Sequence, residues 1–554
     1  MFKLNPNKGQ FHIEDPILTF PRYVQGALSK TWAPYYYQNI FKKIGEERFS
    51  TLFSENYSRP NAPVNILVGL LFLKEINGWT DEEMIGALYF DYRVQYALGI
   101  TDFEKERICI NTVGNFRKRL YEYSEEYGTD LLEEEVQALT GALIEFIGMD
   151  TSKARQDSFM ISANCKRMGR LELVYTINAN LVKQLAKVDE VLVPSSCRHY
   201  LEEQDKADQV YRLTKDEAEG RLKQLLQESR TLLECVPESL REGRPYENLA
   251  RLLNEQTKET EAGVIPKDNS EISANSQQNP SEPDATYRKK GNKQSVGYVV
   301  NTVEARDEEK GVSMVIHHEQ QPNTASDVDL GRNALDAGLD GVETLANDGA
   351  YYGADVVEKA AEKGIEMGFS AMTGKKTADG RIGVNEFTID ENGQIRACPA
   401  GFAPESAQYK SDKETYTAKF AKENCADCPQ FENCPVKEQK KFNKVTFTKK
   451  NLQADICRAK MGGALYQELA AFRAGVEGVP SVMRRKYGID HIPVRGLIRS
   501  RIWVNCKFMA YNFMSFFGYC RRKAKVGEGS TFLSCVYHRF FRVVTFLRLK
   551  MSEC

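Results

Sequence analysis

Apolar and polar positions are arranged differently in successive regions of the chain. In residues 1–145 apolar side chains recur at helical spacing, and Trp79-Thr-Asp-Glu-Glu-Met predicts a helix start with an N-cap followed by acids. Residues 111–120 form a further amphipathic stretch, which includes the basic cluster Phe116-Arg-Lys-Arg-Leu. Several short helices with basic and aromatic edges fit either a DNA-binding domain or a plain helical bundle.

A β-like segment precedes a long helical one. Residues 154–164 alternate loosely between apolar and polar side chains, which predicts a strand. Residues 168–260 combine helical spacing with many charges, which predicts a helical insertion. Residues 262–283 are rich in Pro, Ser, Asn, Gln and Glu and have few apolar side chains, so we expect a flexible connection there.

The pattern then becomes β/α. Two paired strands are predicted at Ser295–Val303 and Gly311–His318. They are followed by a helix (Ser326–Ala337), a strand (Val342–Ala346), a helix (Gly353–Lys363) and a strand (Gly364–Met372). With residues 154–164 as the missing first strand, this order predicts an α/β layer.

Two further changes follow this layer. Residues 375–450 are polar and contain short β-like pieces, which predicts a small β-rich insertion. From about residue 454 the pattern is helical again, with one apolar face formed by Leu465, Leu469, Phe472 and Val476.

Composition places the chain among globular proteins. Its 554 residues are 42% hydrophobic and 27% charged, which predicts several domains with sizeable cores. No apolar run reaches the ~18 residues that a membrane helix needs, and the first residues lack the apolar stretch of a signal peptide. We therefore expect a cytoplasmic location, where most of the 13 cysteines serve as small core side chains.

The net charge of −2 conceals a strongly basic C-terminal region. Between Arg484 and Lys550 there are 15 Lys and Arg residues and two acids, Asp490 and Glu528. Aromatic residues are interleaved with these cations, namely Trp503, Tyr511, Phe513, Phe516, Phe517 and Tyr519. This pattern suits a polyanion partner such as nucleic acid; the alternative is a helical layer whose cations face water.

Three acids stand in sequence frames that suit metal chemistry. Asp348 follows a predicted strand end, a position that either faces the cleft of an α/β sheet or caps a helix. Asp157 interrupts a predicted strand, where aspartate is depleted, and Asp150 is its rival. Glu477 follows Arg473 by four residues, which fits an ordinary intrahelical ion pair. Two aspartates and a glutamate brought together by a fold can hold divalent metals for phosphoryl transfer.

Together these frames resemble the transposases of bacterial insertion sequences, in the DDE class with a ribonuclease-H-like catalytic core. The first frame is Arg155-Gln-Asp157-Ser158-Phe and the second is Asp348-Gly-Ala-Tyr-Tyr352. The third resembles the signature Tyr-x2-Arg-x3-Glu-x6-Lys, here Ala470-x2-Arg473-x3-Glu477-x6-Arg484. Ala470 thus replaces the tyrosine of the signature, and Arg484 replaces its lysine and keeps the charge.

Other segments extend the resemblance over most of residues 60–520. Gly78-Trp-Thr-Asp-Glu-Glu and Phe116-Arg-Lys-Arg-Leu look like the N-terminal helical domain of the family. Pro283-Asp-Ala-Thr-Tyr-Arg-Lys-Lys-Gly291 looks like the lead-in to its second strand, and such proteins often carry an insertion before the glutamate-bearing helix. Each motif is weak by itself, and their order and spacing make the set fairly specific.

The resemblance implies an α/β fold: a ribonuclease-H-like mixed-sheet core with an N-terminal all-α domain, a helical insertion and a small Cys-containing β-rich insertion. The implied divisions begin with an N-terminal helical, DNA-binding domain (1–145), the first part of the catalytic core (146–170) and the helical insertion with its flexible connection (171–283). They continue with the main catalytic core (284–374), the Cys-rich insertion (375–452) and the C-terminal helical part with the basic tail (453–554).

The resemblance also implies a chemistry. The protein would bind the ends of a mobile element, cleave phosphodiester bonds and join the freed 3′-OH to target DNA. Two Mg²⁺ or Mn²⁺ ions would be held by Asp157, Asp348 and Glu477. DNA phosphates would be contacted by Arg473 and Arg484. Lys289 and Lys290 are further candidates for contact with the DNA backbone, and the alternative for this pair is a solvated run of charges.

Double-stranded DNA is the partner that this chemistry requires, and joining two ends implies a homodimer. The implied location is the bacterial cytoplasm, in association with the nucleoid. Two alternatives stay open: a metal-dependent DNA nuclease without strand transfer, and a catalytically inactive DNA-binding derivative.

Four of the cysteines are grouped, at Cys398, Cys425, Cys428 and Cys434. A Cys-x2-Cys pair with two further thiolates predicts a tetrahedral structural Zn²⁺ site, and unligated thiols are the alternative. A reducing cytosol favours a metal over disulfides. Zinc here would support the fold rather than catalyse, because the hard Mg²⁺ ion prefers oxygen ligands.

Overall fold

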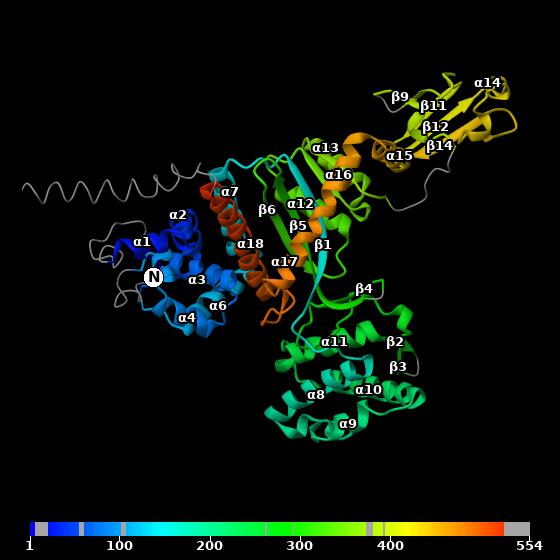
Figure 1. The fold of residues 1–554 in the computed structure, drawn as a ribbon. Helices are drawn as coiled ribbons and strands as arrows, with labels where there is room; N and C mark the ends of the chain where they lie inside the picture. The colour runs from blue at the N-terminus through cyan, green and yellow to red at the C-terminus, as the bar shows by residue number, and fades with distance from the viewer. Residues whose placement is uncertain are drawn as a thin grey trace, which may run out of the picture.

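The computed structural model describes residues 1–5, 20–54, 60–100, 107–260, 263–291, 293–372, 380–391 and 394–525. A mixed β-sheet lies at its centre, with a cluster of N-terminal helices on one side (Figure 1). A helical insertion and a small β-rich unit project from this body in different directions (Figure 1). Within the described ranges, no helix is both long and apolar enough to cross a membrane.

The central sheet is built around strand β1 (Lys153–Ser162). On one side β1 pairs antiparallel with the long strand β5 (Lys293–Asp307), which also pairs antiparallel with β4 (Thr286–Lys290) and β6 (Val312–Pro322). On the other side β1 pairs in parallel with β7 (Thr344–Asn347), which is followed by the parallel strand β8 (Glu366–Phe369). The predicted strands of the β/α region are therefore confirmed, and β5 and β6 extend beyond their predicted ends.

Helices cover both faces of this sheet because the side chains of β1 alternate between two apolar layers. Ser158 Oγ donates a hydrogen bond of 2.7 Å to Asp327 Oδ1 on α12 (Asp327–Ala337), which with α13 (Ala354–Glu362) lies on one face. Arg155 Nη1 donates to the carbonyl of Phe472, 2.9 Å away, near the end of α16 (Ala464–Ala474) on the other face. The helices α12 and α13 were predicted from the sequence and are confirmed.

The described residues of the N-terminal region form seven α-helices, as its apolar spacing predicts: α1 (Arg22–Ser29), α2 (Ala33–Asn39), α3 (Val64–Asn77), α4 (Asp81–Phe90), α5 (Tyr92–Ala97), α6 (Ile110–Tyr127) and α7 (Leu131–Ile147). Thr80 and Glu83 form a capping box at the start of α4. In the basic cluster that follows Phe116, Arg117 donates hydrogen bonds of 2.7 and 2.8 Å to the carboxylate of Asp81. Part of that cluster therefore stabilises the helical domain.

The long helix α18 (Leu497–Lys525) lies between these helices and the sheet (Figure 1). Its aromatic residues Trp503, Phe513, Phe516 and Phe517 are all buried in one core shared with α3, α7 and β6. Four of the six aromatic residues that suited a polyanion partner are thus core residues, because helical spacing turns them toward the protein interior. The other two, Tyr511 and Tyr519, are partly buried and pack against the same core. Residues 526–554 of the basic region lie outside the described residues.

The helical insertion has a hydrophobic core of its own. It consists of α8 (Arg170–Val188), α9 (Asp205–Val210), α10 (Lys215–Cys235) and α11 (Arg244–Gln256), followed by the hairpin β2 (Thr257–Thr260) and β3 (Gly263–Pro266).

The following segment, expected as a flexible connection, is packed in the structure. Gln277 and Glu282 are fully buried. Gln277 Nε2 donates to Asn248 Oδ1 at 2.7 Å, and Tyr298 donates to Glu282 Oε1 at 2.8 Å. Side-chain hydrogen bonds hold this polar segment, a contribution that its low apolar content does not reveal.

The Cys-rich insertion is β-rich, as predicted. It contains the pair β9 (Thr388–Ile389) and β10 (Ile395–Ala397), a short helix α14 (Lys422–Ala426), and a four-stranded sheet in the order β11 (Ser406–Lys410), β12 (Thr415–Phe420), β14 (Asn443–Thr448) and β13 (Lys437–Glu438). Helix α15 (Lys449–Met461) leads from this sheet back to α16 (Figure 1).

Candidate active site

The parallel pairing of β1 with β7 places Asp157 and Asp348 side by side. Arg155 is the register partner of Ala346, so two residues further along each chain the aspartates face each other at the carboxyl ends of the paired segments. Sites in open α/β sheets form at this edge. The structure thus brings together two of the three acids that the sequence singled out.

Arg473 of α16 lies between these two carboxylates. Its Nη2 atom is 3.3 Å from Asp157 Oδ1 and 3.4 Å from Asp348 Oδ2. The side chains of Arg473 and Asp157 are 16% and 21% exposed, whereas that of Asp348 is 45% exposed, so the site opens to solvent on the Asp348 side. Two carboxylates that converge on one cation form an oxygen-rich pair of the kind that also suits a divalent metal.

The local backbone explains why the side chain of Asp348 is not used as a helix cap. It precedes the turn η8 (Gly349–Tyr351) but makes no side-chain capping hydrogen bond, so the helix-cap alternative does not hold. A Cβ atom on Gly349 would lie 1.5 Å from the carbonyl oxygen of Ala371, two residues after the end of β8. Only glycine fits there, and this close approach fixes the turn that presents Asp348.

Glu477 lies on the turn η11 (Gly475–Glu477), between α16 and α17 (Gly478–Arg485), and is exposed. Because Arg473 pairs with the two aspartates, the ordinary Arg473–Glu477 ion pair is not formed. In the described part of the chain, no group of three or more His, Cys, Asp or Glu side chains is placed to hold a metal ion. The structure therefore brings the two aspartates together and does not join Glu477 to them in one cluster.

A buried ion pair positions the segment that carries Arg473 and Glu477. Arg155 and Glu304 are 6% and 1% exposed, and Arg155 Nη2 lies 2.6 Å from Glu304 Oε2. The same guanidinium donates to the carbonyl of Phe472 in the last turn of α16, which also accepts a hydrogen bond from the backbone N–H of Gly475. A Cβ atom on Gly475 would lie 2.1 Å from Arg155 Nη1. Arg155 thus links β1, β5 and the start of η11, a role that its place beside Asp157 in the sequence did not reveal.

A second polar network borders the other face of β1 next to Asp157. Asp327 accepts a hydrogen bond from Ser158 Oγ at 2.7 Å and lies 3.3 Å from Arg288 Nη2. Burial, with the nearby charges of Asp327 and Asp157, holds the pKa of Tyr351 well above its usual range, so this tyrosine stays a neutral hydrogen-bond donor. Arg288 and Asp327 were missed from the sequence, although Arg288 directly precedes the lysines that were considered.

The cationic residues expected to contact phosphate lie on different strands and helices. Arg484 donates to the carbonyl of Met160 at 2.8 Å and pairs with Asp490 at 3.1 Å, so it lies along the carboxyl half of β1. Lys289 is exposed on β4, and the side chain of Lys290 lies outside the described residues. The rival acid Asp150 accepts a hydrogen bond from the backbone of Ser152 at 2.9 Å, which gives it a turn-capping role.

The four grouped cysteines line one small cavity of about 20 Å³ in the Cys-rich insertion. Burial raises the pKa of Cys434, and the sulfurs of Cys398, Cys425 and Cys428 are close enough to raise it further. The fold thus gathers the sulfurs that the sequence grouped, although they do not form a ready metal-binding group among the described residues.

Comparison with known proteins gave two matches to family models. A model described as a transposase DDE domain matches residues 397–517, which include Arg473 and Glu477. A model described as a transposase domain (DUF772) matches residues 34–119, which span helices α2 to α5 and part of α6. No curated protein and no solved structure matched the chain.

Proposed function

The chain belongs to the DDE transposases of insertion sequences, and from this premise we propose that it cleaves DNA at the ends of a mobile element and joins the freed 3′-OH to target DNA. The observation that carries this proposal is the parallel register of β1 and β7, which sets Asp157 and Asp348 around one cation. We further propose a ribonuclease-H-like core, supported by the mixed sheet in which Asp157 lies within β1 and Asp348 directly follows the parallel strand β7, and domain boundaries as stated from the sequence.

We propose that Asp157 and Asp348 hold Mg²⁺ or Mn²⁺, because their donor set consists of hard carboxylate oxygens that already converge on a cation. When bound there, such an ion supplies Lewis acidity at the scissile phosphate. Glu477 is the third carboxylate of this proposal, since it follows by one turn the arginine that touches both aspartates. Its turn η11 packs against β1, where Gly475 lies against Arg155.

The arginines near the acids have a complementary task. The planar guanidinium of Arg473 donates to two carboxylates at once and suits a phosphate oxygen equally well. Arg484 lies further along β1, where it can meet the next part of the DNA backbone. Binding the phosphates on this side of β1 would orient the scissile bond against the carboxylates. Lys289 and Lys290 on β4 are further proposed phosphate contacts.

Joining two element ends requires that two active sites act together, so we propose a homodimer on double-stranded DNA. We also propose a structural Zn²⁺ ion between the four cysteines of the Cys-rich insertion. The chemistry of the donors fits, because four thiolates with one Cys-x2-Cys pair suit tetrahedral zinc, and all four line a single cavity.

The decisive experiment supplies a duplex with the element end and a target duplex, with Mg²⁺ or Mn²⁺. Asp157→Asn and Asp348→Asn should each abolish cleavage while binding of the end survives, and Glu477→Gln should do the same. Asp150→Asn is the matched control, because Asp150 caps a turn near the same strand, and it should cleave like the wild type. Cleavage by the Asp157→Asn protein would refute the assignment, and nicked DNA that is never joined would identify a nuclease.

A further inference from the structure

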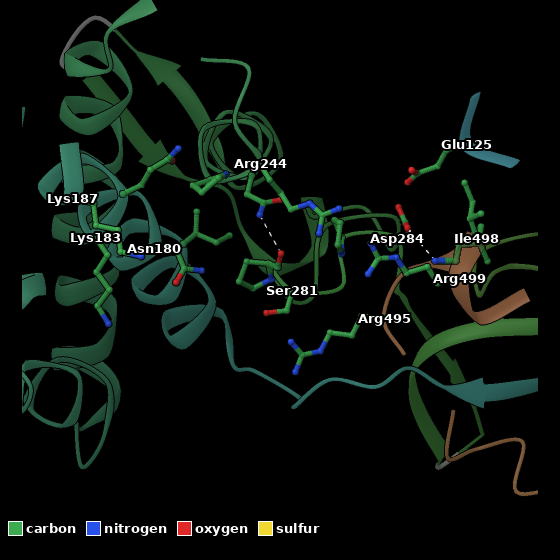
Figure 2. Close-up of a pocket in the computed structure, with 18 residues that line it drawn as sticks. Glu125, Asn180, Lys183, Lys187, Arg244, Ser281, Asp284, Arg495, Ile498 and Arg499 are labelled. Carbon is green, nitrogen blue, oxygen red and sulfur yellow. Dashed lines mark hydrogen bonds between the residues drawn. The ribbon is translucent and has the colours of Figure 1, made fainter. Parts of the chain in front are cut away.

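A large open cavity lies between the helical insertion and the core, away from the acids described above. It has a volume of about 790 Å³ and is lined by α8, the start of α11, the packed connection near residue 281 and the chain at the start of α18. Figure 2 shows cationic side chains from opposite walls of this cavity, with Lys183 and Lys187 on one side and Arg499 on the other. We call this cavity the insertion cleft.

Five cations line the insertion cleft: Lys183, Lys187, Arg244, Arg495 and Arg499. All five are exposed, and among the described residues none of them forms an ion pair with a carboxylate. Two acids also line the cleft, and one of them, Asp284, accepts a hydrogen bond of 3.2 Å from the backbone N–H of Leu497. The excess of positive charge is therefore left for a partner outside the protein.

The cations come from elements far apart in the sequence and are held in different ways. Lys183 and Lys187 are four residues apart on α8, so they project from one face of that helix. Arg495 Nε donates to the carbonyl of Asn164 at 3.1 Å, which ties this wall to the chain that leaves β1. The guanidinium of Arg499 lies 4.3 Å from the ring centroid of Tyr121 on α6. Two of the five cations are thus fixed in place by the fold.

The cleft lies in line with the active site. Strand β1 runs from Asp157 to its end at Ser162, and Arg484 and then Arg495 contact the carbonyls of Met160 and Asn164 along the way. Five strand residues span about 17 Å, which equals about five nucleotide steps along one DNA strand. A row of arginines therefore connects the proposed catalytic acids with the insertion cleft.

We propose that the insertion cleft binds the sugar-phosphate backbone of the element-end duplex, at phosphates about five or more nucleotides from the cleaved bond. This inference rests on the proposed function, because it places the substrate of that same active site. The helical insertion then acts as a second wall that holds the duplex in register with Asp157 and Asp348. Contacts of this kind position DNA without reading its sequence.

The test uses the full chain with Lys183→Gln and Lys187→Gln combined, since both side chains are exposed and glutamine keeps a good helix propensity. The matched control combines Lys215→Gln and Lys223→Gln, two exposed lysines on α10 of the same insertion that do not line the cleft. Binding of a fluorescent end-containing duplex is measured by anisotropy with Ca²⁺ in place of Mg²⁺, between 50 and 200 mM salt (roughly the range over which phosphate contacts are resolved).

Each phosphate contact contributes about 0.9 to the slope of log affinity against log salt, or about eightfold in affinity at ~0.1 M salt. The cleft variant should therefore bind about 60-fold more weakly than the wild type with a slope about 1.8 less steep, while the control variant matches the wild type. Duplexes with single neutral methylphosphonate linkages locate the contact: substitutions about five or more nucleotides from the cut should weaken the wild type and leave the cleft variant unaffected.

The outcomes separate the two ideas. If the cleft variant binds with the wild-type affinity and slope, the insertion cleft is not a DNA-binding surface, whatever the wild type does to the DNA. If wild type binds and the variant binds weakly, but no Mg²⁺- or Mn²⁺-dependent cleavage occurs, the proposed catalysis fails and the cleft stands. Weaker binding of a mononucleotide, without any loss of duplex binding, would overturn the proposal in favour of a small-molecule site.

Discussion

Replacing Gly475 by alanine tests how the segment that bears Glu477 is held against β1. The backbone at Gly475 is helical, with φ −70° and ψ −14°, so alanine meets no conformational obstacle. The obstacle is steric, because the new Cβ atom would lie 2.1 Å from Nη1 and 3.0 Å from Cζ of Arg155. Gly478, just after Glu477, is also helical, and a Cβ atom added there would have no neighbouring atom within 4 Å, so Gly478→Ala is the matched control.

The size of the effect follows from what Arg155 must give up. Its guanidinium is held by Glu304 at 2.6 Å and by the carbonyl of Phe472 at 2.9 Å, in a buried setting. Overpacking alone costs about 1–3 kcal/mol, and separating a buried ion pair costs about 3–5 kcal/mol. We expect Gly475→Ala to lower the free energy of unfolding by about 3 kcal/mol, between these limits. Gly478→Ala should be neutral or stabilise by up to about 1 kcal/mol, because alanine is the better helix former.

Urea unfolding of both variants measures these free energies, and cleavage of an end-containing duplex measures the placement of Glu477 and Arg473. Gly475→Ala should lose cleavage even under conditions where it is fully folded, whereas Gly478→Ala should keep it. A Gly475→Ala protein that is as stable and as active as Gly478→Ala would refute the role of Arg155 in positioning this turn.

Three further predictions concern charge and metal. In calorimetry without DNA, the Arg473→Gln protein should bind Mn²⁺ about fivefold more tightly than the wild type, because the substitution removes about 1 kcal/mol of ion pairing that competes with the metal. The control Arg485→Gln should leave the Mn²⁺ affinity unchanged. An unchanged affinity in Arg473→Gln would show that Arg473 does not compete with the metal. Burial lowers the pKa of His318 to about 4. Below pH 6.5 the unfolded chain binds a proton at this histidine and the folded protein does not, so the free energy of unfolding should fall as the pH falls from 6.5 towards 4. The stability difference between wild type and His318→Gln should shift by about 1.6 kcal/mol between pH 6.5 and pH 5, and a constant difference would show that His318 titrates normally. Purified protein should contain one zinc per chain, Cys428→Ser should lose it, and Cys457→Ser should retain it; a metal-free wild type would exclude the zinc site.

Much of the secondary structure was predictable because it depends on neighbouring residues. The β/α alternation after residue 295 and the capping box at Thr80 are both local patterns, and both are confirmed. The segment that contains Gln277 and Glu282 was not predictable, because its order comes from hydrogen bonds to distant residues rather than from apolar content. The aromatic residues of α18 likewise looked like a binding surface until their packing against α3 and β6 was known.

For the candidate site, the sequence by itself determined which acids to consider, since Asp157 interrupts a predicted strand and Asp348 follows a predicted strand end. The tertiary structure decided which side chain pairs with these two aspartates. A spacing of four residues favours an Arg473–Glu477 pair within one helix, but the register of β1 and β7 offers Arg473 two carboxylates instead of one. That choice depends on contacts between residues 125 and 316 positions apart, which no local pattern encodes. The insertion cleft has the same origin, because its cations are scattered along the chain and only the fold gathers α8 and the start of α18 around one cavity.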